Sequence, residues 1–162
     1  MTKKIRIHGK EEVHECAEAI VSAAKASDLH VQKKEIETKY DNEAHIRISD
    51  KPIKDKSPVV GPDFILFINE EMELKKSTKD AKDNTMAILN AQKKPKIKNI
   101  KKKNIVIVDA YNLGLENISQ NIVWPAILGA FINKYGKISL TNTDDVIDND
   151  LMKIVHESHR AM

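Results

Sequence analysis

The scarcest residue in this chain is cysteine. Only Cys16 is present among 162 residues, so an internal disulfide is excluded and a thiolate metal cluster lacks enough ligands. Long apolar runs are also missing, and stretches such as 64–68 and 105–108 are far too short to cross a bilayer. The basic start at residues 1–4 is followed by no apolar segment of signal-peptide length, so we expect a cytoplasmic location.

The charge is nearly balanced but unevenly distributed. Hydrophobic residues make up 41% and charged residues 31%, which is typical of a globular protein, and the net charge is +3. Seven lysines and no acids lie between Lys93 and Lys103. This run has no arginine for forked phosphate contacts and no aromatic residue for base stacking. We therefore favour a solvated loop over an anionic contact, and binding of nucleic acid is not expected.

Hydrophobic periodicity predicts buried strands that alternate with amphipathic helices. The expected strands are 4–8, 31–36, 44–48, 64–68, 85–89 and 105–108. The expected helices are 11–27, a short one near 70–76, 123–135, and one from 144 to the end with Thr143 as its N-cap. Continuous apolar strands indicate a sheet covered on both faces. The sequence thus predicts one α/β domain over residues 1–162, with a mostly parallel sheet sandwiched by helices in a Rossmann-like three-layer arrangement.

The first strand-to-helix turn is the first candidate ligand site, because ligands bind at this edge of such sheets. Gly9 and Lys10 could contact a phosphate-bearing cofactor there. A phosphate cradle needs several small residues, however, and this turn has one glycine followed by Glu11 and Glu12, which would repel an anion. The interpretation that Gly9 simply permits a tight turn is therefore favoured.

Other candidate residues are weaker. We expect Cys16 to be a buried, inert thiol, because it lies on the apolar face of the first helix. His156 and His159 could share a helix face, but no third metal ligand is evident. Residues 109–112 follow a buried strand at the functional edge, where a capping turn is the favoured interpretation.

Trp124 and Pro125 begin an apolar helix near the same edge. Together with Asn112 they are candidates for a partner interface, since tryptophan is frequent among binding hot spots. Packing of Trp124 in the core is the equally weighted alternative.

Several segments resemble one known family. Residues 46–53, Ile-Arg-Ile-Ser-Asp-Lys-Pro-Ile, are similar to a strand and turn of the gamma subunit of pyruvate:ferredoxin oxidoreductases. Pro62-Asp63, residues 108–110 (Val-Asp-Ala) and residues 126–131 (Ala-Ile-Leu-Gly-Ala-Phe) resemble further motifs of that family, in the same order. The opening residues 5–9 also look like its first strand. The ordered set covers nearly the whole chain.

The resemblance implies a role in an assembly. Gamma subunits belong to complexes that decarboxylate a 2-oxoacid on thiamine diphosphate and pass electrons through iron–sulfur clusters to ferredoxin, forming acyl-coenzyme A. The gamma subunit holds neither thiamine diphosphate nor clusters, and it is implicated in coenzyme A binding. The resemblance thus implies a mainly structural subunit for a 2-oxoacid, in the first place pyruvate, with Gly9 and Lys10 as any residual coenzyme A contact.

The departures concern the polar and glycine-rich motifs. The family's "GRGGQG" loop is replaced by Gly9-Lys10-Glu11-Glu12, its "FGPERRG" stretch by residues 38–42, and its "NT" by Trp124-Pro125. A non-catalytic interaction domain derived from this fold is therefore the alternative hypothesis. The expected partners are the other subunits of the complex, with a homodimer as a further alternative.

Overall fold

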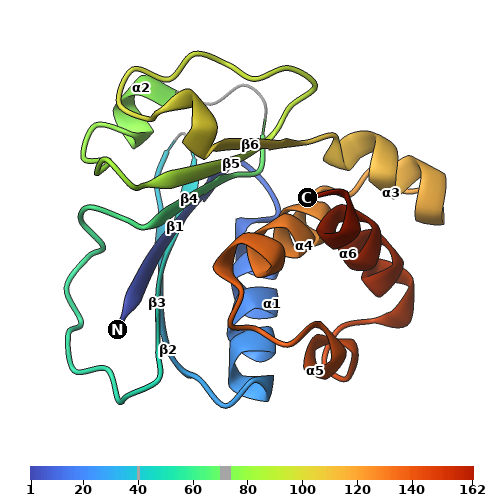
Figure 1. The fold of residues 1–162 in the computed structure, drawn as a ribbon, viewed down its shortest axis with the longest axis horizontal. Helices are drawn as coiled ribbons and strands as arrows, with labels where there is room; N and C mark the ends of the chain where they lie inside the picture. Colours follow the sequence, from blue (N-terminus) through green and yellow to red (C-terminus); the bar gives the residue numbers. More distant parts are fainter. Residues whose placement is uncertain (40, 70–73) are drawn as a thin grey trace.

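The computed structural model describes residues 1–39, 41–69 and 74–162, and these residues form a six-stranded mixed sheet with helices packed against it (Figure 1). The strands are β1 (Lys3–Gly9), β2 (His30–Glu37), β3 (Asn42–Ser49), β4 (Phe64–Phe67), β5 (Met86–Asn90) and β6 (Ile105–Val108). Their order is β2-β3-β1-β4-β5-β6. The predicted α/β class with a mostly parallel sheet is confirmed.

The two strands at one side of the sheet run antiparallel to their neighbours. β3 pairs antiparallel with both β1 and β2, whereas β1, β4, β5 and β6 form parallel pairs. A short turn joins β2 to β3, in which the backbone N–H of Thr38 donates to the carbonyl of Asp41 at 2.9 Å. A connection this short can join only antiparallel strands.

One face of the sheet carries most of the helices. These are α1 (Val13–Ala26), α3 (Ala110–Ile118), α4 (Trp124–Tyr135), α5 (Leu140–Asp144) and α6 (Asn149–Ala161). Helices α1 and α4 lie against the strands, and α6 packs on α4 as an outer layer (Figure 1). Between them lies the larger apolar core, which includes Ile5, Ile7, Ile46, Leu66, Ile127 and Phe131.

Among the described residues, the second face has a smaller apolar core and little helical cover. It is covered by α2 (Leu74–Ser77), the 3₁₀ turn η1 (Lys102–Asn104) and connecting loops. Its buried side chains are Ile65, Phe67, Ala87, Leu89, Ile97, Ile100 and Ile105. The three layers are therefore unequal in thickness.

The helix boundaries differ from the prediction at three places. Helix α1 begins at Val13, so Glu11 and Glu12 precede it. The predicted final helix is two helices, because Asp148 caps α6, and Thr143 is buried inside α5 instead of acting as an N-cap. A capping turn was predicted at residues 109–112, whereas residues 110–118 form the helix α3.

The predicted short helix at 70–76 is represented by α2, and residues 70–73 lie outside the described part of the chain. Among the described residues, no helix has the length and apolar character needed to cross a membrane.

Candidate functional site

A cleft of about 410 Å³ opens at the carboxyl ends of the parallel strands. Ile68 and Asn69 follow β4, Asn90 ends β5 and Asp109 follows β6, so the cleft lies where ligands bind in open α/β sheets. Its lining residues are Glu11, Glu12, Ile68, Asn69, Asn90, Gln92, Asp109, Tyr111, Asn121 and Val123. These described residues offer carboxylates, amides and a phenol but no cationic side chain.

Glu12 fills the position in this cleft that suits an anionic ligand best. Its Oε1 accepts hydrogen bonds from the backbone N–H groups of Val123, at 2.9 Å, and Trp124, at 3.1 Å. These groups open α4, whose N-terminus has a positive partial charge and N–H groups without partners inside the helix. A carboxylate of the chain itself thus stands where a phosphate binds at a helix N-terminus.

The polar backbone groups of the first turn are also bound within the protein. The Lys10 N–H donates to Asn69 Oδ1 at 2.7 Å, and the Lys10 carbonyl accepts from Asn42 Nδ2 at 3.1 Å. A Cβ on Gly9 would lie 2.9 Å from Val13 Cγ2 and 3.0 Å from Asn69 Oδ1, so glycine is needed there for close packing. Contact of Gly9 and Lys10 with a cofactor remains a prediction, and only the exposed Lys10 side chain is free to make it.

Glu12 acts on a different helix from the one expected. The sequence placed Glu11 and Glu12 in the first turn of α1, and this placement is wrong. Glu12 is the N-cap of α1 with a left-handed backbone (φ 63°), and its side chain reaches across to α4. The expected effect, a carboxylate opposing an anion at this edge, follows from the new position as well.

The residues after β6 have a capping role. Asp109 is the N-cap of α3, and its carboxylate accepts from the Asn112 backbone N–H at 3.4 Å and from Asn112 Nδ2 at 2.6 Å. Trp124 is 7% exposed and Pro125 is buried, so the structure places both in the core. An interface at Asn112, Trp124 and Pro125 remains a prediction, in which the exposed Asn112 and its neighbour Tyr111, 47% exposed, offer the accessible surface.

The remaining sequence candidates are not brought together. Burial raises the pKa of the Cys16 thiol well above its usual range, which disfavours the reactive thiolate. His156 Nε2 lies 2.7 Å from Asp144 Oδ1. Among the described side chains, neither group that is close enough to share a metal ion includes His156 or His159.

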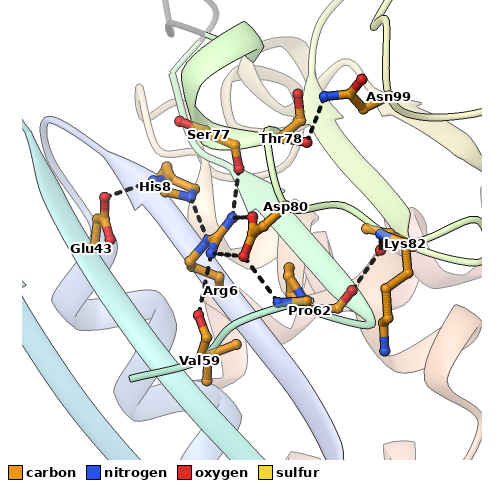
Figure 2. Close-up of polar contacts among 12 residues, drawn as sticks. Arg6, His8, Glu43, Val59, Pro62, Ser77, Thr78, Asp80, Lys82 and Asn99 are labelled. Carbon is orange, nitrogen blue, oxygen red and sulfur yellow. Dashed lines mark hydrogen bonds and ion pairs between the residues drawn. The ribbon is translucent and has the colours of Figure 1, made fainter. Parts of the chain in front are cut away.

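A buried polar cluster on the second face of the sheet was not identified from the sequence. Figure 2 shows Arg6 on β1 reaching the segment after α2. Its guanidinium donates to Asp80 at 2.6 and 3.0 Å, to the Ser77 carbonyl at 2.6 Å and to the Val59 carbonyl at 3.3 Å. The hydrogen bonds from Arg6 are the main cause that lowers the pKa of Asp80 to about 2. Arg6 thereby fixes two loops onto the sheet.

His8 belongs to the same cluster and is held neutral. Burial is the main cause that lowers its pKa to about 4. Its Nε2 accepts a hydrogen bond from Arg6 Nε at 3.1 Å, so the ring proton lies on Nδ1, which faces Glu43 Oε1 at 3.5 Å. His8, Asp41 and Glu43 lie close enough to share a metal ion. In this tautomer, however, Nδ1 has no lone pair to offer a metal.

The second group with metal-ligand spacing is His14, Glu18 and Glu35, on the surface. The Lys33 ammonium donates to both Glu18 and Glu35, the latter at 2.9 Å. A cation of the chain already balances these two carboxylates. Neither of these groups of described residues fits a resident metal ion.

Strand alternation is the signal that could have indicated the buried cluster. Ile5 and Ile7 face the larger core, so Arg6 and His8 must face the opposite side of the same strand. In β3, Ile46 and Ile48 alternate with the buried His45 and Arg47 in the same way. Two neighbouring strands with this pattern predict a polar layer on the second face.

Comparison with known proteins identifies the family. The family model described as pyruvate ferredoxin/flavodoxin oxidoreductase matches residues 16–161. The chain is 30% identical over 109 residues to the pyruvate/ketoisovalerate oxidoreductases common subunit gamma of Thermococcus kodakarensis, covering 64% of this chain and 59% of that protein. It is 28% identical over 116 residues to the pyruvate synthase subunit PorC of Methanothermobacter marburgensis, covering 71% of this chain and 59% of that protein. The match therefore spans 59% of the length of each relative.

Solved structures share the fold over the whole chain. The pyruvate oxidoreductase subunit PORC of Thermotoga maritima superposes with a TM-score of 0.77 at 19% identity, covering 99% of this chain and 94% of that one. The 2-oxoglutarate:ferredoxin oxidoreductase of Magnetococcus marinus matches with a TM-score of 0.73 at 15% identity, covering 99% of this chain and 30% of that one. The resemblance predicted from the motifs is confirmed: the chain belongs to the pyruvate ferredoxin/flavodoxin oxidoreductase family.

Proposed function

We propose that the chain is a non-catalytic, gamma-type subunit of a cytoplasmic 2-oxoacid:ferredoxin oxidoreductase complex, with pyruvate as the first 2-oxoacid to test. Membership of the family over residues 16–161 is the observation that carries this proposal. Thiamine diphosphate and the iron–sulfur clusters would reside on the other subunits. A single, buried cysteine supplies this chain with no cluster ligands of its own.

The cleft geometry supports a structural role over a coenzyme A site. Coenzyme A carries phosphates that need N–H donors or cations, yet the described lining residues of the cleft are acidic or neutral. The N-terminus of α4 is already bound by Glu12. The described residues that line the cleft therefore do not fit the phosphates of coenzyme A, and we expect the free chain to bind it weakly or not at all.

Gentle purification of the tagged chain from its native host tests the assembly. We expect chains that carry thiamine diphosphate and iron–sulfur clusters to accompany it in a fixed ratio. The purified chain alone should neither decarboxylate a 2-oxoacid nor reduce ferredoxin. Turnover by the chain alone would overturn this division of roles.

Repeated absence of cofactor-bearing chains would favour the alternative, an interaction domain that works outside such a complex. The contact of Glu12 with the start of α4 favours this alternative, because it occupies N–H groups that could otherwise hold an anionic ligand. Calorimetric titration with coenzyme A decides the ligand question separately. Saturable binding at micromolar concentration that is lost in Lys10→Ala would restore a ligand site to the first turn.

A further inference from the structure

We propose that the ten lysines of residues 75–79 and 93–103 form a docking surface for a carboxylate-rich face of a partner protein. This set is called the lysine surface below. It shares no residue with the cleft lining, and the inference does not depend on the proposed complex.

The path of the chain places these lysines on the second face of the sheet. β5 ends at one edge and the parallel β6 begins at the opposite edge, so residues 91–104 must return along the length of the sheet. They cross the second face as a strap without an α-helix, and Figure 1 shows them in yellow beside α2. Ile97 and Ile100, 5% and 6% exposed, anchor the strap in the smaller core.

Side-chain hydrogen bonds fix the strap to its surroundings. Asn99 Nδ2 donates to the Thr78 carbonyl at 3.2 Å, which joins the strap to the segment after α2, as Figure 2 shows. Asn104 Nδ2 donates to the Asp83 carbonyl at 3.2 Å. Arg6 in turn holds Ser77 onto the sheet. Blocks of like charge are usually disordered tails, whereas these lysines project from a structured support.

Among the residues that the structure describes, the lysine surface has little balancing charge. All ten of its lysines are exposed, and within the described residues only one has a carboxylate within 4 Å, Lys101 with Asp83 at 3.8 Å. The other residues of the chain include 17 basic ones, from a total of 27, against 24 acidic ones. The basic excess of the chain is therefore concentrated in these two segments of its sequence. Such a field attracts and orients an anionic partner.

The composition of the surface favours a protein partner over a nucleic acid. Residues 75–79 and 93–103 contain no arginine and no aromatic residue. Arginine supplies forked phosphate contacts and aromatic rings stack on bases, whereas lysine is a compact, hydrated point charge. Lysines on a fixed support match single carboxylates spread over a folded surface.

The test compares two charge-reversal variants of equal net charge by fluorescence anisotropy in about 150 mM salt, where long-range attraction is largely screened. The test variant carries K94E, K96E, K98E and K102E. The control variant carries K25E, K34E, K51E and K54E, which are exposed lysines outside the lysine surface. The probes are a labelled peptide with about ten glutamates and a single-stranded DNA with about ten phosphates, which present similar charge. Circular dichroism establishes that both variants are folded.

We expect the wild-type chain and the control variant to bind the peptide at least as tightly as the DNA, and the test variant to lose roughly tenfold in peptide affinity. Equal losses in both variants would mean that net charge alone attracts the peptide and would overturn the proposal. Tighter binding of DNA than of peptide would make a nucleic acid the occupant. A dimer of the free chain that dissociates only in the test variant would make a second copy the occupant. Absence of peptide binding by the wild-type chain would also overturn it.

Discussion

Replacing Glu12 by alanine tests whether a carboxylate of the chain occupies an anion site at the start of α4. The change removes the acceptor of two backbone N–H groups, those of Val123 and Trp124. Loss of a helix cap costs about 0.5–2 kcal/mol. Hydrogen bonds to a charged acceptor contribute about 1.5–3 kcal/mol. We therefore expect Glu12→Ala to lower the free energy of unfolding by about 2 kcal/mol.

Two matched controls separate the effect of the carboxylate from that of the left-handed backbone at Glu12. Alanine and glutamate both have a Cβ, so the φ of 63° penalises them similarly, whereas glycine relieves about 1 kcal/mol of that strain. Glu12→Gly should therefore lose only about half as much stability as Glu12→Ala. Glu12→Gln keeps an oxygen acceptor and loses the charge, so its loss should be about 1 kcal/mol.

Urea unfolding and thermal melting measure these differences, and about 2 kcal/mol corresponds to a melting temperature lower by roughly 4–8 °C in a chain of this size. Inorganic phosphate should then raise the melting temperature of Glu12→Ala more than that of the wild-type chain, because the vacated N–H groups can bind it. An unchanged melting temperature in Glu12→Ala, or an equal response of both proteins to phosphate, would refute the reasoning.

Three further changes test the packing. Because the pKa of Asp80 is lowered to about 2, its pair with Arg6 stabilises the fold above about pH 4 and this stabilisation is lost as the pH falls toward 2. Asp80→Asn should thus cost about 1–2 kcal/mol at neutral pH in urea titrations, with a smaller difference near pH 2.5, and a pH-independent difference would contradict this origin. Trp124→Ala should cost about 3 kcal/mol and leave capture of partner chains by the folded protein intact, whereas lost capture would support an interface role. A Cβ on Gly129 would lie 2.3 Å from the Val155 carbonyl, so Gly129→Ala should separate α4 from α6 and lower the melting temperature strongly, and an unchanged melt would contradict the close contact.

The strands were predictable because their signal is local. A continuous apolar run such as residues 64–68 is typical of a strand that is buried on both faces of the sheet, and β4 occupies nearly that range. The antiparallel pairing of β2 with β3 follows from the short turn between them. The apolar runs carry no information about the direction in which neighbouring strands run. Helix α3 was missed because its sequence, with Asn112, Gly114 and Asn117, has weak helix propensity. It is held instead by the Asp109 cap and by packing on α6.

The negative charge at the cleft was predictable from the sequence, but the contacts of the residues that carry it were not. Glu11 and Glu12 indicated an edge unfavourable for anions from their charge alone. The partners of Glu12 lie 111 and 112 positions later in the chain, so no local pattern could identify them. The buried cluster has the same difficulty, since Arg6 is balanced by Asp80, 74 positions away. Local alternation predicts which face a side chain takes, and the fold alone supplies its partner.

Three of the residues that carry the family resemblance act in packing and loop anchoring. Gly129 allows α4 to approach α6 closely. Asp63 Oδ2 accepts from the Lys4 backbone N–H at 2.8 Å, and Arg47 Nη1 donates to the Ser57 carbonyl at 2.6 Å. None of these contacts involves a group that lines the cleft. These three residues can therefore be kept while the ligand edge changes, whereas Asp109 lies in a matching motif and also lines the cleft. For this chain, the matching motifs support the fold and the family, whereas coenzyme A binding must be argued from Glu12 and its neighbours.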